Sequence, residues 1–120
     1  MRLIATIAAS VVVASGLTVT LAAQGKAEQG AALFSAQKCT LCHSVAGKGN
    51  PKGSLDAMIA KNKAEHIRQW LQDPEGMRAK QNATRTPAMK PVKLTPDQID
   101  ALVAYLTSVK PAKSGDDTGR

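Results

Sequence analysis

The stretch Cys39-Thr40-Leu41-Cys42-His43 decides how this chain of 120 residues is organised, because it holds both cysteines and one of the two histidines. The arrangement C-x-x-C-H is typical of covalent c-type haem attachment. Two thiols three positions apart on a helical turn can reach both vinyl groups of a haem and form two thioether bonds. His43 is then aimed at the centre of the ring, where its imidazole can bind the iron. The stretch therefore predicts Cys39 and Cys42 as cofactor-binding residues and His43 as a metal ligand.

Other chemistries share this cysteine spacing. A C-x-x-C pair also serves thioredoxin-like redox centres and zinc half-sites. A dithiol centre would need the motif at a helix start within a βαβ pattern, and no β-rich run follows residue 23. Zinc would need His66 as a fourth ligand, but the neighbouring Cys42 and His43 can hardly both face one tetrahedral ion. Zinc, dithiol chemistry and a structural disulfide stay open beside haem.

The first 23 residues have the pattern of a secretory signal. Met1-Arg2 precedes an almost wholly apolar or small stretch from residue 3 to 21, and Ala22-Ala23 offers a cleavage point. An uncleaved anchor is the alternative, since about 19 residues could just span a bilayer. Thioether formation also requires export, so both signals predict the periplasm or the outer face of the cytoplasmic membrane.

Residues 24–112 are predicted to form one small all-α domain. Aromatic side chains are scarce, with only Phe34, Trp70 and Tyr105 present. Such a domain would have a thin core, and a buried haem would supply the missing apolar mass.

Helices are expected over residues 26–38, 56–63, 64–72 and 96–109, and the last is the best marked. Thr95-Pro96-Asp97-Gln98 combines a hydroxyl cap, a proline at the first helical position and a capping-box glutamine. Gly30, inside the first helix, suggests close approach by another backbone. Residues 47–54 and 76–93 are expected to be loops, and residues 113–120 a disordered tail.

With these elements in order, residues 30 to 106 resemble a small class I monohaem cytochrome c. The resemblance implies three to five helices wrapped around one covalently bound haem c. It also implies that the first and last helices cross, with Gly30 and Phe34 meeting Leu102 and Tyr105.

The resemblance also implies the second iron ligand. In that family it is a methionine on a proline-containing loop before the last helix, and Met89 in residues 86–91, Thr-Pro-Ala-Met-Lys-Pro, stands there. Many relatives place a proline directly after this methionine, whereas Lys90 intervenes here. Met77, Met58 and His66 are the competitors for the iron.

Two further residues are assigned through the resemblance. Trp70 is similar to the family tryptophan whose indole N–H reaches a haem propionate. Pro51 resembles the proline whose carbonyl accepts the second imidazole N–H of His43.

The expected function is that of a single-electron carrier rather than an enzyme. The alternatives are a haem-based peroxidase or gas sensor with an open iron position, and a dedicated electron-transfer subunit of a larger oxidoreductase. The net charge of +7 predicts redox partners with acidic docking surfaces. Nucleic acid is not expected as a partner of an exported chain with only three aromatic residues. The lysines expected around the haem edge are Lys38, Lys48, Lys52, Lys90 and Lys93.

Overall fold

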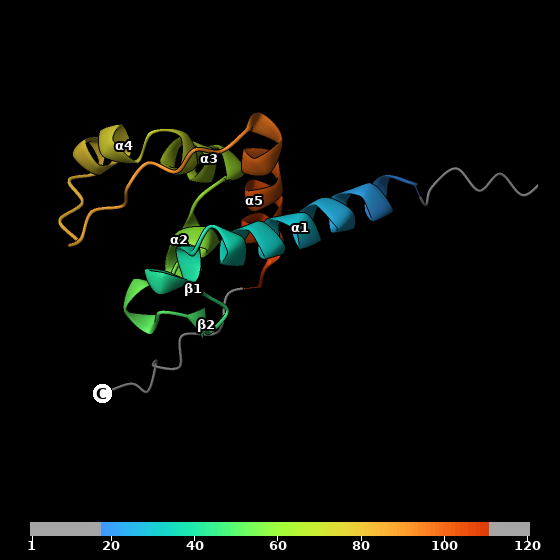
Figure 1. Cartoon of the computed structure of the whole chain (residues 1–120), viewed down its shortest axis with the longest axis horizontal. Coiled ribbons are helices and arrows are strands. Elements are labelled where there is room, and N and C mark those ends of the chain that lie inside the picture. The colour runs from blue at the N-terminus through green and yellow to red at the C-terminus, as the bar shows by residue number, and fades with distance from the viewer. Residues whose placement is uncertain (1–17, 111–120) are drawn as a thin grey trace, which may run out of the picture.

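A computed structural model describes residues 18–110, with side chains described from residue 25 onward. It contains five α-helices and two very short strands, which confirms the expected all-α fold (Figure 1). The α-helices are α1 (Thr18–Ala36), α2 (Asp56–Lys61), α3 (Ala64–Gln72), α4 (Pro74–Lys80) and α5 (Pro96–Ser108). The short elements are the 3₁₀ turns η1 (Cys39–Leu41) and η2 (Pro51–Gly53) and the antiparallel strands β1 (Ser44–Val45) and β2 (Lys48–Gly49).

Helices α1 and α5 cross at close quarters, as the resemblance implies (Figure 1). A Cβ atom at Gly30 would collide with the backbone carbonyl of Ala101 and with Cβ of Tyr105. The rings of Phe34 and Tyr105 pack beside this crossing, with centroids 5.8 Å apart and planes tilted by 56°. Glycine is therefore required at position 30, because no side chain fits between the two backbones.

The hydrophobic core lies under this crossing. Its buried residues are Phe34, Val45, Ile67, Ile99, Leu102, Val103 and Leu106. Four of them come from α5 at the i, i+3, i+4, i+7 spacing that places side chains on one helical face. The core thus joins α1, β1 and α3 to the apolar face of α5.

The predicted start of α5 is confirmed in detail. The Thr95 hydroxyl accepts from the backbone N–H of Gln98 at 3.3 Å, and the Gln98 side chain accepts from the Thr95 N–H at 2.9 Å. This reciprocal pair satisfies N–H groups that a helix start would otherwise leave free.

The expectation of a loop from residue 76 is wrong, because residues 74–80 form α4. The Asp73 side chain accepts from the Gly76 N–H at 2.9 Å, and Pro74 occupies the first turn. The capping hydrogen bond and the charges at its two ends stabilise this helix. Its two turns are too short to show an apolar period in the sequence. The extended loop that carries Met89 begins only after Lys80.

One carboxylate links three helices at the surface. Asp100 of α5 pairs with Arg68 of α3 at 2.7 Å and with Lys26 of α1 at 3.7 Å. The hydrogen bond from Arg68 is the main reason that the pKa of Asp100 is lowered.

Most of the predicted signal, residues 1–17, and the predicted tail, residues 113–120, lie outside the described residues. The helix α1 begins at Thr18 and so runs across the predicted cleavage point after Ala23. Within residues 18–110, no helix has the length and apolar character needed to cross a membrane. The domain boundaries stay predictions.

Candidate haem site

The two cysteines lie on one tight turn that follows α1. Lys38 adopts a left-handed conformation with φ 58°, which ends the path of α1 and starts η1. The backbone N–H groups of Cys42 and His43 both donate to the carbonyl of Cys39, at 3.2 and 2.9 Å. This turn places both cysteines and His43 on one short stretch of backbone.

Both cysteines are free thiols in differing surroundings. Cys39 is half-buried and packs against the hydrophobic core, whereas Cys42 is exposed. Burial raises the pKa of the Cys39 thiol, so this group is protonated at neutral pH. The pair therefore offers one thiol at the core and one at the surface of the same turn.

The His43 ring is fixed by a backbone carbonyl. Its Nδ1 lies 3.1 Å from the carbonyl oxygen of Gly53, so we assign the proton to Nδ1. Burial lowers the pKa of His43, the nearby positive charge of Arg85 lowers it further, and the hydrogen bond to Gly53 opposes both. The ring is thus held neutral with Nε2 left to act as a ligand, which is the form that binds metal.

The expectation that Pro51 supplies this carbonyl is wrong. Pro51 is exposed and begins η2, while the buried Gly53 ends that turn. A Cβ at Gly53 would collide with the Cys42 carbonyl, so only a residue without a side chain can come this close to the haem motif. The glycine could have been considered from the sequence, because Gly53 closes the Pro-Lys-Gly turn.

Arg85 is a site residue that sequence reasoning missed. Its Nη2 donates to the carbonyl of Cys42 at 2.7 Å, across 43 positions of sequence. No sequence signal marks it, since an exposed arginine in a loop has no periodic or motif context.

Met89 is half-buried on the wall of an open cavity of about 690 Å³ between α4 and the following loop. Arg78, Asn82 and Lys90 also line this cavity.

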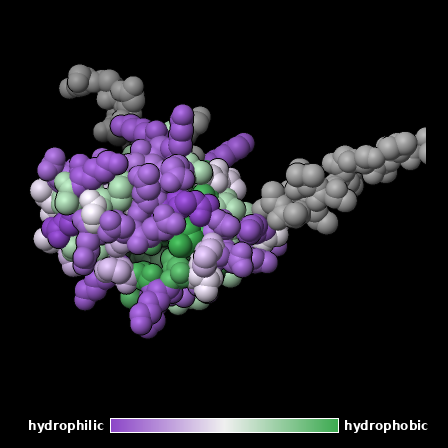
Figure 2. Space-filling model, turned by 90° about the horizontal axis from the view of Figure 1, so that it is seen from above, coloured by the Kyte–Doolittle hydropathy of each residue, from purple (hydrophilic) through white to green (hydrophobic). Residues whose placement is uncertain are grey.

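Trp70 is half-buried on α3 and is not among the side chains that pack on the core cluster. On the face seen in Figure 2, hydrophobic side chains are exposed in a hollow framed by hydrophilic ones. Hydrophobic side chains therefore reach the surface in this hollow.

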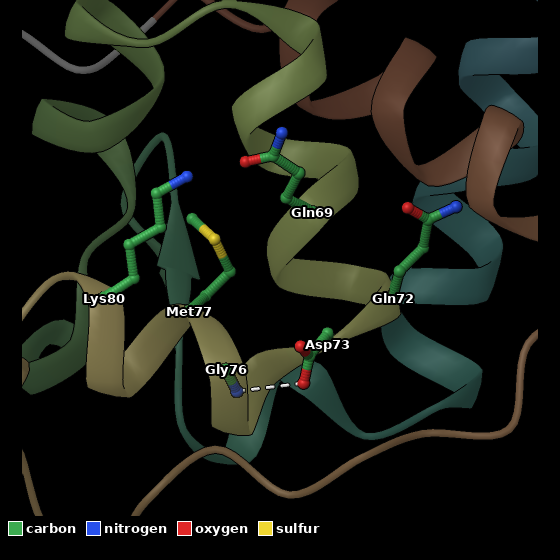
Figure 3. A pocket seen from close by; sticks show the side chains of 6 residues that line it. All are labelled: Gln69, Gln72, Asp73, Gly76, Met77 and Lys80. Atoms are coloured by element: carbon green, nitrogen blue, oxygen red, sulfur yellow. Dashed lines mark hydrogen bonds between the residues drawn. The ribbon is translucent and has the colours of Figure 1, made fainter.

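Met77 lies on a second, smaller cavity of about 300 Å³ (Figure 3). Its side chain extends between Lys80 and Gln69 and is only 5% exposed. Met58, in contrast, packs on the core from α2. Burial alone does not choose between Met77 and Met89, so ligation by Met89 stays a prediction.

The donor set fits a covalently bound haem. Two free thiols and an imidazole with one nitrogen already engaged are the groups that c-type attachment uses. Within the described part of the chain, no group of three or more His, Cys, Asp or Glu side chains is placed to hold a metal ion.

Comparison with known proteins agrees with this geometry. The family model for cytochrome c matches residues 27–110. The chain belongs to the cytochrome c family. Membership of this family implies covalent haem c and electron transfer through it.

Among curated proteins, this cytochrome is similar to cytochrome c oxidase subunit 2 of Alkalihalophilus pseudofirmus. The two are 28% identical over 93 residues, which cover 70% of this chain and 26% of the relative. The chain thus spans about a quarter of the length of that relative. No solved structure matches this cytochrome significantly.

Proposed function

We propose that this protein is a single-electron carrier that holds one haem c through Cys39 and Cys42, with His43 and Met89 as axial ligands. The observation that carries the proposal is the His43 ring, which is fixed by Gly53 beside two free thiols on one turn. This arrangement supplies every protein group that covalent attachment and proximal ligation need.

The bound haem supplies reversible one-electron chemistry at its iron. The chain's own residues hold and orient it. Cys39 and Cys42 would hold the ring, Gly53 would keep the His43 imidazole in one orientation, and the thioether of Met89 would serve as the second iron ligand. A thioether ligand favours ferrous iron, and two retained ligands exclude other molecules from the iron. Trp70, which does not pack on the core, is available for a propionate.

The proposed place of action is the periplasm or the outer face of the cytoplasmic membrane, because c-type attachment needs exported, reduced cysteines. The proposed partners are redox proteins with acidic surfaces. All five lysines assigned to the haem edge are exposed. Such a set of charges steers a diffusing partner to the site of electron transfer.

A dedicated electron-transfer subunit is the second candidate, and the similarity to an oxidase subunit favours it. It uses the same haem chemistry and differs only in having a permanent partner. Stable co-purification with another polypeptide would favour the subunit over the diffusing carrier.

The deciding experiment is an absorption spectrum of the exported, purified protein in both redox states, with and without carbon monoxide. A c-type reduced spectrum with the far-red methionine-to-iron band, unchanged by carbon monoxide, is expected. A missing band with a carbon monoxide shift would support an open iron position and thus the peroxidase or sensor. Absence of haem would leave thiol chemistry.

Paired substitutions identify the methionine ligand. Met89→Leu should remove the far-red band, open the iron to carbon monoxide and lower the reduction potential, because the thioether is lost. Met77→Leu, a matched change on the neighbouring cavity, should leave all three properties unchanged. The reverse result would identify Met77 as the ligand.

A further inference from the structure

Arg85 makes a contact that joins two distant parts of the site. Among the hydrogen bonds of residues 25–110, one links the loop 81–95 to the segment 39–53, and it runs from Arg85 Nη2 to the Cys42 carbonyl. The same guanidinium lies against Gly53, so close that a side chain there would collide with it. Arg85 therefore lies against Cys42, which precedes His43 in the chain, and against Gly53, whose carbonyl holds the His43 ring.

The loop has few other anchors. Its start is held by Arg78, whose Nε donates to the Ala83 carbonyl at 3.0 Å, and its end by the Thr95 cap. Between Ala83 and Thr95, the described hydrogen bonds include only the one from Arg85. Met89 lies in this stretch, so its distance from the haem motif depends on few contacts.

The position of Arg85 limits where Met89 can go. The two residues are four positions apart, and an extended chain spans at most about 3.6 Å per residue, so their Cα atoms stay within about 14 Å. Pro87 and Pro91 flank Met89 and further restrict the backbone. Fixing Arg85 on the haem motif thus confines Met89 to the same region.

We propose that Arg85 is a positioning residue that fastens the Met89 loop to the haem motif and so slows the departure of Met89 from the iron. The proposal rests on the proposed function, because it requires Met89 as a ligand. The hydrogen bond has a charged donor, which makes it stronger than a neutral one, and its exposure to water limits its effect.

The test measures how fast imidazole replaces Met89 in the ferric, haem-loaded protein, followed by loss of the far-red band. Arg85→Gln should increase this rate roughly threefold to tenfold, in keeping with one exposed hydrogen bond to a charged group. Lys93→Gln is the matched control. It removes the same charge from the same loop, also four positions from Met89, but Lys93 makes no hydrogen bond to the haem motif within the described residues.

The outcomes separate the two proposals. A wild-type protein without the far-red band would contradict ligation by Met89 itself. A wild-type protein with the band, in which Arg85→Gln and Lys93→Gln exchange at the same rate, would overturn the role of Arg85 alone.

Should Arg85→Gln fail to yield haem-loaded protein, Arg85→Lys carries the test. Lysine keeps the charge but lacks the planar fork that reaches Cys42 and Gly53 together. Its exchange rate should exceed that of the wild type and of Lys93→Gln, and equality with both would overturn the proposal.

Discussion

Two glycines of α1 occupy opposite environments, and the difference can be measured. Gly30→Ala would drive a methyl group into the Ala101 carbonyl and should destabilise the protein by about 1–3 kcal/mol, the usual range for overpacking. Gly25→Ala is the control, because nothing lies within 4 Å of its Cβ position. It should leave stability unchanged or raise it by up to about 1 kcal/mol. Denaturant unfolding measures both, and equal stabilities for the two variants would contradict the close helix crossing.

For single residues, the sequence predicts those contacts that only one type of amino acid can make. Gly30 was identifiable because glycine inside a helical pattern needs a reason, and the motif identified Cys39, Cys42 and His43. Arg85 was not identifiable, and the Pro-Lys-Gly turn marks Gly53 only as one candidate, because both roles depend on where two turns and a loop meet in space. The carbonyl of Gly53 and the guanidinium of Arg85 reach the haem motif only after the chain has folded.

Among the elements, α1, α3 and α5 are joined by Asp100, and this link should make stability depend on pH. The carboxyl has a pKa below the usual value of about 3.9, so its contribution is complete above that value and is lost as the pH falls through the lowered pKa. Asp100→Asn should therefore be less stable than the wild type at pH 7, and the difference should vanish in acid.

Thermal unfolding as a function of pH measures this difference. High salt should reduce it, since the three side chains are partly exposed. In an Arg68→Gln background the effect of Asp100→Asn should shrink, because the main partner of the carboxylate is gone. A difference that persists unchanged at low pH would mean that the loss comes from packing rather than charge.

The helices differ in how well they could be predicted. Helix α5 has both an apolar period and a capping box, so its start was predicted correctly. Helix α4 has only seven residues and was predicted as loop, although Asp73, Pro74 and Glu75 form an N-terminal signal. Short helices depend on such end signals, because their apolar residues are too few to repeat.

For the whole molecule, the basic surface should control how fast electrons leave. Lys48→Glu and Lys52→Glu, both at exposed positions near the haem motif, should slow electron transfer to an acidic partner several-fold at low salt. Lys61→Glu makes the same charge change at an exposed lysine of α2 that is not among the five assigned to the haem edge, and should have a smaller effect. Stopped-flow rates across a salt series measure this, and identical salt slopes for all three variants would contradict a localised docking surface.

The crossing of α1 and α5 also has a consequence for the order of events during synthesis. Its two partners lie at opposite ends of the described residues, so α5 leaves the ribosome only after α1 and every described element between them. Four of the seven buried core residues belong to α5. A nascent chain that lacks α5 therefore has no helix against which the apolar side of α1 can pack. The cysteine turn thus belongs to an unfinished domain until α5 has been made, and during that time its thiols stay accessible to haem-attachment chemistry.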